Sequence, residues 1–88
     1  MASEKSPGLT LYQSEYCPYC HRVRLAAQEL GLDLPMKDTF IDRAARAELI
    51  AGGGKPQVPC LRIEQPGGEP QWMYESSDII RYLQSRFG

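Results

Sequence analysis

The feature that most constrains this chain is the tetrapeptide Cys17-Pro18-Tyr19-Cys20, which lies where an apolar, strand-like segment at residues 9–12 gives way to a helical pattern. Proline suits the first position of a helix, because its missing N–H would have had no partner there. Thiols three residues apart on a first helical turn face the same way and lie close enough to form a disulfide. Unpaired N–H groups and the helix dipole favour a negative charge on the first sulfur. Because a thiolate is the nucleophile of disulfide exchange, the motif indicates redox chemistry.

Length and charge argue against several classes of protein. Eighty-eight residues form one domain with a modest core, which we expect to span residues 9–88 after a flexible lead-in at residues 1–8. Ten basic and eleven acidic side chains give a net charge of −1, which argues against nucleic acid or an anionic membrane as the main partner. The apolar runs are only a few residues long, so the sequence predicts no membrane-spanning segment. The first residues also lack the apolar core of a secretion signal.

The cysteine count favours reactive thiols over a disulfide scaffold. Three is an odd number, and a C-x-x-C pair in a chain of alternating strands and helices fits a reducing compartment, so we expect a cytoplasmic protein. A structural zinc site would need four converging ligands, for which the chain offers only Cys17, Cys20, Cys60 and His21. We therefore expect no metal site. Cys60 follows Pro59 on a predicted strand, so its side chain should point into the core.

Hydrophobic periodicity and turn residues predict seven elements in the order β-α-β-α-β-β-α. The strands are expected at residues 9–13, 36–40, 58–64 and 71–74, and the helices at 18–30, 43–50 and from Ser76 or Ser77 to Phe87. A helix between the first two strands suggests a parallel, right-handed βαβ unit. The last two strands are joined by a short turn and should be antiparallel.

Short sequence signals mark the expected helix ends. Gly31 supplies the left-handed residue that ends the first helix. Asp42 is the expected N-cap of the second helix, and Gly52-Gly53-Gly54 should stop it. Ser76 or Ser77 is the expected N-cap of the last helix.

With these features the chain resembles the glutaredoxins, small proteins of the thioredoxin fold. The resemblance covers residues 9–87 and rests on the order of elements and on three motifs: Cys17-Pro18-Tyr19-Cys20, Val58-Pro59 at the start of the third strand, and Glu75-Ser76-Ser77-Asp78 at the opening of the last helix. It implies an α/β fold with a four-stranded mixed β-sheet and three helices. It also implies a cis peptide bond before Pro59, facing the C-x-x-C motif.

The resemblance implies a monomeric, glutathione-dependent thiol-disulfide oxidoreductase that reduces protein disulfides and glutathione mixed disulfides. Cys17 would attack the disulfide, and Cys20, one turn later and more buried, would resolve the intermediate. The sequence carries no nicotinamide or flavin motif. Reducing power is therefore expected from glutathione or from another protein.

The resemblance also implies a glutathione site. Tyr19 would form a wall of it, and Val58 would offer its backbone N–H and C=O to the glutathione cysteine, as an added strand does. Serine hydroxyls at the helix N-terminus would donate to the γ-glutamyl carboxylate, and Glu75 or Asp78 would balance the ammonium group. Lys55 would bind the glycyl carboxylate. The full set of expected glutathione-binding residues is Tyr19, Lys55, Gln57, Val58, Pro59, Glu75, Ser76 and Ser77.

Two positions depart from the usual glutaredoxin pattern. Tyr74-Glu75 stands where many glutaredoxins have Gly-Gly, and Ser14 stands where a lysine often precedes the active-site cysteine by three residues. Glu75-Ser76 is more similar to the N-terminal domain of glutathione transferases, which shares the fold.

Two alternative functions stay open. Some glutaredoxins hold an iron–sulfur cluster between two subunits, although Pro18 and the second cysteine argue against this function here. A transferase-like domain would instead bind glutathione and conjugate it to an electrophile. The chain length argues against that function, because the helical domain that supplies the second substrate pocket would be absent.

Overall fold

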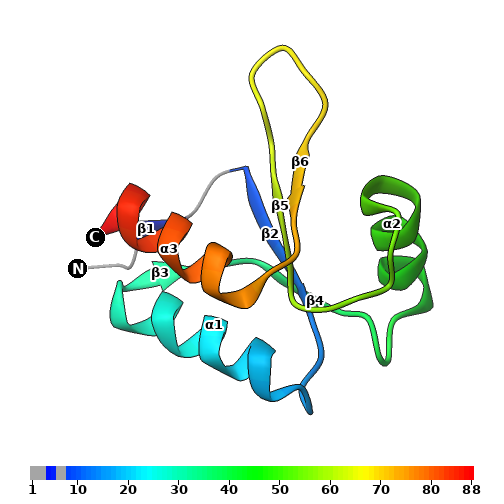
Figure 1. Ribbon diagram of the computed structural model, residues 1–88, viewed down its shortest axis with the longest axis horizontal. Coiled ribbons are helices and arrows are strands. Elements are labelled where there is room, and N and C mark those ends of the chain that lie inside the picture. Colours follow the sequence, from blue (N-terminus) through cyan, green and yellow to red (C-terminus); the bar gives the residue numbers. More distant parts are fainter. Residues whose placement is uncertain (1–3, 6–7) are drawn as a thin grey trace.

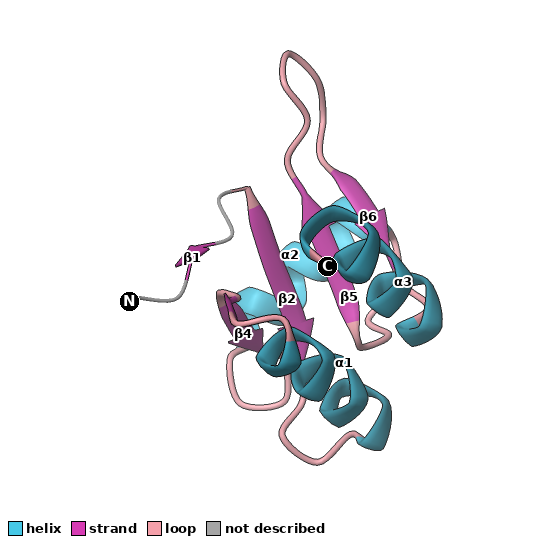
Figure 2. Ribbon diagram, turned by 90° about the vertical axis from the view of Figure 1, so that its left-hand side faces the viewer, coloured by secondary structure: helices cyan, strands magenta, loops and turns pink. Residues whose placement is uncertain are grey.

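The computed structural model describes residues 4–5 and 8–88, and at its centre lies a four-stranded β-sheet with the strand order β4-β2-β5-β6 (Figure 1). The strands of this sheet are β2 (Leu9–Gln13), β4 (Met36–Asp38), β5 (Cys60–Ile63) and β6 (Gln71–Met73). The helices are α1 (Pro18–Glu29), α2 (Arg43–Gly53) and α3 (Ser76–Phe87). Figure 2 shows α1 and α3 side by side on one face of the sheet, with α2 on the other face. No helix among the described residues is long and apolar enough to cross a membrane.

The pairing of the strands confirms the predicted fold class. β2 and β4 are parallel, with Leu11 opposite Met36, and α1 connects them as the helix of a βαβ unit. β5 runs antiparallel to β2, and β6 runs antiparallel to β5. The sheet is therefore mixed, and its four strands and the three helices follow one another in the predicted order β-α-β-α-β-β-α.

Two additional strands are too short to be predicted from hydrophobic alternation. β1 (Glu4–Lys5) pairs in parallel with β3 (Leu32–Asp33), outside the four-stranded sheet. β1 lies in the segment expected to be a flexible lead-in, of which residues 1–3 and 6–7 fall outside the described part of the chain. A domain boundary at residue 9 therefore stays a prediction.

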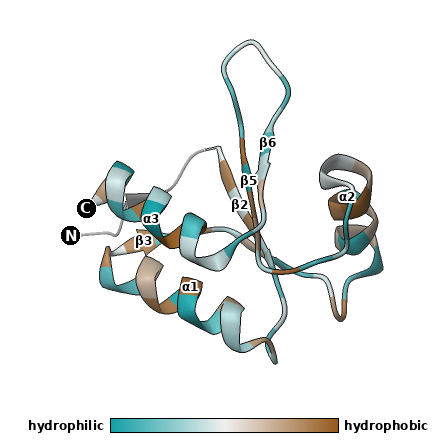
Figure 3. Cartoon of the chain, in the orientation of Figure 1, coloured by the Kyte–Doolittle hydropathy of each residue, from teal (hydrophilic) through white to brown (hydrophobic). Residues whose placement is uncertain are grey.

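Two hydrophobic clusters, one on each face, hold the helices against the sheet. The larger cluster joins the sheet to α1 and α3 and contains Leu9, Leu11, Val23, Ala27, Leu34, Leu61, Ile63, Ile79 and Leu83. The smaller cluster joins the sheet to α2 and contains Tyr12, Ala45, Leu49 and Cys60. In Figure 3, hydrophobic colouring accordingly runs along β2 and β5, the two central strands. All side chains of these strands except Thr10 and Arg62, which are partly exposed, are buried, so the strands form a rigid base for the loops that follow them.

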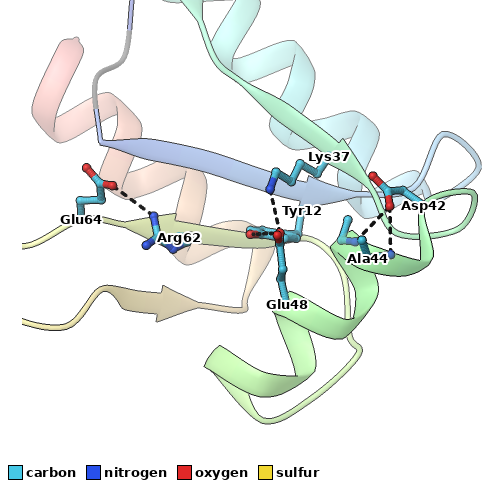
Figure 4. A network of polar contacts seen from close by, with 8 residues as sticks. Tyr12, Lys37, Asp42, Ala44, Glu48, Arg62 and Glu64 are labelled. Carbon is cyan, nitrogen blue, oxygen red and sulfur yellow. Dashed lines mark hydrogen bonds and ion pairs between the residues drawn. The ribbon is translucent and has the colours of Figure 1, made fainter.

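A polar network strengthens the attachment of α2 to the sheet (Figure 4). The Tyr12 hydroxyl donates to Glu48 Oε1 over 3.0 Å, and the Lys37 ammonium lies 2.7 Å from the same oxygen. Burial, followed by the neighbouring Glu48 carboxylate, raises the pKa of Tyr12 to about 12. The phenol therefore stays protonated at neutral pH and remains a donor to α2.

Helix α2 begins where the sequence predicts and ends later. The Asp42 carboxylate caps it by accepting hydrogen bonds from the N–H groups two and three residues further on, over 3.0 and 3.1 Å. The predicted stop at residues 52–54 is wrong for its first two residues, because the helix continues through Gly53. Only Gly54 takes the left-handed conformation that ends a helix, with φ at +92°.

The N-terminus of α3 also differs from the prediction. Glu75 is the N-cap residue and no side chain caps the first turn, so the prediction that Ser76 or Ser77 caps this helix is wrong. The backbone is still extended at Glu75, with φ −80° and ψ 130°, whereas both serines are already helical. A capping side chain must belong to the extended residue, and both serines lie one or two positions too late. The first N–H groups of α3 are therefore left without a side-chain cap.

Candidate active site

Cys17 lies between β2 and α1 as the N-cap residue of the helix, with Pro18 at the first helical position. Its side chain makes no capping hydrogen bond and is half-buried, so the sulfur is reachable from solvent. The Sγ atom lies 4.0 Å from the backbone oxygen of Val58. The reachable thiol thus faces the loop before β5, as the resemblance to glutaredoxins implies.

Cys20 lies one turn further along α1 and is fully buried. Its sulfur accepts a hydrogen bond from the Ser14 N–H over 3.4 Å. Burial raises the pKa of Cys20 to about 12, so this thiol keeps its proton at neutral pH. The two sulfurs of the motif are therefore chemically different: one is reachable, and the other is enclosed and protonated. Both are free thiols.

A cleft of about 230 Å³, which we call the narrow cleft, brings together most of the expected glutathione-binding residues. Its lining consists of Tyr19, Gln57, Val58, Pro59, Tyr74, Glu75 and Ser76. The Val58–Pro59 peptide bond is cis, as the resemblance implies. Lys55 and Ser77, which were also expected here, do not line this cleft.

A second cleft of about 570 Å³, which we call the wide cleft, shares Val58 with the narrow cleft. Its lining consists of Ser14, Tyr16, Cys17, Thr39, Phe40, Arg46 and Val58. Arg46 is the only cationic residue in this lining, and no described carboxylate forms an ion pair with it. The sequence does not single out Arg46, because an exposed arginine on a helix is usually solvated. Only the packing of α2 against the sheet brings it to the cleft that contains Cys17.

Tyr74 is a site residue that the sequence reasoning did not assign. Its hydroxyl donates to the Lys55 backbone oxygen over 3.0 Å and accepts from the Lys55 N–H over 3.3 Å. The same hydroxyl occupies the space in which a Cβ at Gly53 would stand. Burial raises the pKa of Tyr74, which keeps the phenol protonated. The sequence feature that could have pointed to Tyr74 is the Tyr74-Glu75 pair, which stands where many glutaredoxins have Gly-Gly before the last helix.

The position of Lys55 follows from the same contacts. Its ammonium group lies 4.9 Å from the centroid of the Tyr74 ring, a cation–π geometry. Lys55 lines neither cleft. The structure therefore does not bring Lys55 to the thiol, and this leaves Arg46 as the cation that lines a cleft with Cys17.

Cys60 is fully buried in the smaller hydrophobic cluster, as predicted. Burial raises the pKa of its thiol to about 12. His21 is exposed on α1. Within residues 4–5 and 8–88, no group of three or more histidine, cysteine, aspartate or glutamate side chains is placed to hold a metal ion.

We expect iodoacetamide at pH 8 to alkylate Cys17 alone in the folded protein. Cys20 and Cys60 are buried, and the pKa of each thiol is about 12. At pH 8, therefore, each of these thiols is ionised in only roughly one molecule in ten thousand. Peptide mass mapping before and after unfolding in guanidinium checks this, and all three cysteines should react after unfolding. Alkylation of Cys20 in the folded protein at a rate similar to Cys17 would contradict its burial.

The substitution Tyr74→Phe should loosen the segment at residues 55–57, because it keeps the ring and removes both hydrogen bonds to Lys55. The free energy of unfolding should fall by about 0.5–1.5 kcal/mol, the net contribution of a typical hydrogen bond, because water can reach the exposed Lys55 backbone once the hydroxyl is gone. Urea unfolding measures the change. Tyr82→Phe is the matched control, because that exposed hydroxyl accepts only one side-chain hydrogen bond, from Arg86. An equal effect of the two substitutions would argue against this role of Tyr74.

Comparison with known protein sequences places these features in context. Residues 16–86 match the protein family described as glutathione S-transferase, N-terminal domain. Glutaredoxin 3 of Escherichia coli (strain K12) is 30% identical to the chain over 57 residues, which make up 65% of this chain and 69% of that protein. Glutaredoxin 3 of Escherichia coli O157:H7 aligns to the same extent.

Solved structures show the same fold. A trimeric glutathione transferase of Leishmania, TDR1, superposes with a TM-score of 0.73 at 26% identity, over 91% of this chain and 18% of that chain. A delta-class glutathione transferase of Nilaparvata lugens gives a TM-score of 0.71 at 29% identity, over 91% of this chain and 36% of that chain. Glutathione transferase E6 of Drosophila melanogaster gives 0.68 at 30% identity, over 91% and 35%. The chain thus spans about a third or less of these transferase chains.

Proposed function

We propose that this chain, which belongs to the family of glutathione S-transferase N-terminal domains, is a glutathione-dependent enzyme in which Cys17 carries out thiol–disulfide exchange. The relationship to glutaredoxin 3 supports a function in glutathione-related thiol chemistry. The single observation that favours exchange is the pair formed by half-buried Cys17 and the enclosed, protonated Cys20. A nucleophile and a resolving thiol need this difference in access. Protein disulfides and glutathione mixed disulfides are the proposed substrates.

The γ-glutamyl end of glutathione would lie in the narrow cleft, which carries suitable groups for both of its charges. The first N–H groups of α3 lack a side-chain cap and are ready to donate to a carboxylate. The Ser76 hydroxyl lines the same cleft and can also donate. The exposed Glu75 carboxylate would balance the ammonium group. Ser77 would contribute through its backbone N–H in the first turn.

The glycyl end would lie in the wide cleft, where Arg46 is the cation of the lining. Val58 lines both clefts, so a peptide bound across it would have Ser76 on one side and Arg46 and Cys17 on the other. A guanidinium group binds a carboxylate through charge-assisted hydrogen bonds. We therefore assign the glycyl carboxylate to Arg46 in place of Lys55, which lies over Tyr74.

In the proposed reaction, the Cys17 thiolate attacks the glutathione sulfur of a mixed disulfide. The bond between the glutathione sulfur and the substrate sulfur breaks, and the substrate leaves as a thiolate that takes up a proton. A second glutathione, as its thiolate, attacks the glutathione sulfur of the Cys17–glutathione disulfide. This step forms glutathione disulfide and restores the Cys17 thiolate.

Reduction of a protein disulfide would need Cys20 as well. Cys17 would first form a mixed disulfide with the substrate protein, and Cys20 would then attack the Cys17 sulfur. The leaving thiolate of the substrate can take the proton that Cys20 must lose, which its raised pKa makes necessary. The products are a reduced substrate and a Cys17–Cys20 disulfide, which glutathione would reduce.

The family match favours a second candidate, glutathione conjugation of the transferase type. In that reaction the glutathione thiolate attacks a carbon electrophile, and no disulfide forms on Cys17. The same two clefts would bind glutathione in either case.

Two assays on the wild-type protein separate the candidates. The first measures reduction of the mixed disulfide of glutathione and 2-mercaptoethanol, with glutathione disulfide detected through glutathione reductase. The second measures conjugation of glutathione to 1-chloro-2,4-dinitrobenzene. Reduction without conjugation supports exchange, and conjugation without reduction supports the transferase-type reaction. The absence of both activities would overturn both candidates.

A further inference from the structure

Two exposed aromatic side chains lie together beside the Cys17 thiol. Tyr16 is 80% exposed and Phe40 is 71% exposed, and neither is part of, or packed against, the two hydrophobic clusters. Their rings meet edge to face, with the centroids 5.8 Å apart. We call this pair the aromatic shelf. Figure 3 shows the hydrophobic tip of the loop between β4 and α2, which carries Phe40. Adjacent exposed apolar side chains indicate a binding surface more strongly than scattered ones.

Asp38, the last residue of β4, holds the shelf in place. Its Oδ1 atom accepts a hydrogen bond from the Phe40 N–H over 2.8 Å, and its Oδ2 atom accepts one from the Glu15 N–H over 3.3 Å. One carboxylate therefore joins the loop that carries Phe40 to the loop that carries Tyr16. An aromatic pair that is held in this way, although it does not serve the core, is preorganised for a binding partner.

The shelf and the thiol line the same cleft. During exchange, Cys17 attacks the glutathione sulfur while the bond between that sulfur and the substrate sulfur breaks. The residues next to the substrate cysteine must therefore lie close to the Cys17 thiol. Glutathione, in the position described above, uses Val58 and Arg46 of the wide cleft. The apolar side chains of Tyr16 and Phe40 are left to contact the other half of the disulfide.

We infer that the aromatic shelf is the docking surface for the protein half of a mixed disulfide, and that it selects cysteines flanked by an aromatic or large aliphatic residue. This inference rests on the proposed exchange function. An aromatic side chain on the shelf would gain apolar burial and edge-to-face packing with Tyr16 and Phe40. A small hydrophilic neighbour of the cysteine would gain neither.

The test uses two synthetic peptides, each joined to glutathione through one cysteine and identical except that phenylalanine or serine flanks that cysteine. For each peptide, kcat/KM is measured with the wild-type protein, with Phe40→Ser and with Tyr16→Ser. Both positions are exposed, so the variants should fold, and circular dichroism checks this. Leu25→Ser is the matched control, because Leu25 is a 45% exposed apolar residue that lines none of the clefts described above.

We expect the wild type and Leu25→Ser to prefer the phenylalanine peptide about fivefold, and the shelf variants to lose most of this preference. A wild-type protein that reduces both peptides equally would overturn the inference while leaving the proposed function intact. A preference that persists in both shelf variants would also overturn it. Failure to reduce either peptide, together with failure on the small mixed disulfide of 2-mercaptoethanol, would instead overturn the proposed function and the inference with it.

Discussion

Replacing Cys17 by serine should lower glutathione-dependent reduction of a small mixed disulfide at least about a thousandfold, which is the scale seen when a covalent nucleophile is removed. Serine keeps the size and the position of the side chain at the start of α1, so the fold and both clefts should persist. The hydroxyl cannot replace the thiolate, because it stays protonated at neutral pH and cannot form a disulfide. Initial rates with the mixed disulfide of glutathione and 2-mercaptoethanol measure the effect.

Cys20→Ser is the matched control for this prediction. The buried thiol keeps its proton and is not needed when glutathione itself resolves the intermediate, so most of the activity with the small substrate should remain. Reduction of a protein disulfide through the dithiol route should be lost in the same variant. If Cys17→Ser stays active, or if Cys20→Ser loses activity with the small substrate to the same extent, Cys17 is not the nucleophile.

Replacing Arg46 by alanine should raise the KM for glutathione about tenfold or more and change kcat little. The side chain is the only cation that lines the wide cleft, and a hydrogen bond to a charged group contributes about 1.5–3 kcal/mol. The contact is made equally in the ground state and in the transition state, so its loss appears mainly in KM. Steady-state kinetics with varied glutathione concentration separate the two parameters.

Arg43→Ala is the control for charge alone. Arg43 lies one turn earlier on α2, is also exposed, and lines neither cleft. It should leave the KM for glutathione nearly unchanged. A second control, Lys55→Ala, tests the assignment made from the sequence. A larger effect of Lys55→Ala than of Arg46→Ala would show that the glycyl carboxylate binds elsewhere.

The sequence predicts the reactive end of the molecule well, because local signals define it. The limits of β2 and the start of α1 follow from an apolar run and from Pro18, whose missing N–H fits only a first helical turn. The cis bond at Val58–Pro59 and the burial of Cys60 follow from the resemblance and from strand alternation. The cap at Asp42 follows from the preference of short acidic side chains for that position.

The residues that the sequence misses depend on contacts between distant segments. Arg46 lines the cleft that contains Cys17 only because α2 packs on the second face of the sheet, and nothing in its neighbours along the chain distinguishes it from other exposed arginines. Tyr74 holds the Lys55 backbone, which is 19 residues away in sequence. The pairing of Tyr16 with Phe40 likewise joins two loops that no periodicity relates.

The errors at the helix ends have local causes. Ser76 and Ser77 are good capping residues by type, but the chain becomes helical directly after Glu75, which places both inside the first turn. The run of glycines after α2 is a correct sign of a helix end, but only Gly54 leaves the helical conformation. A residue type therefore indicates that an end is near, and the backbone decides where it falls.

The most direct measurement is the mass of the covalent adduct that Cys20→Ser forms with glutathione disulfide. Removing the resolving thiol should trap the intermediate, and we predict one glutathione per chain, attached to Cys17 and removed by free glutathione. Peptide mass mapping identifies the cysteine. A chain that stays unmodified, or that carries glutathione on Cys60 and not on Cys17, would contradict the proposal that Cys17 exchanges disulfides with glutathione.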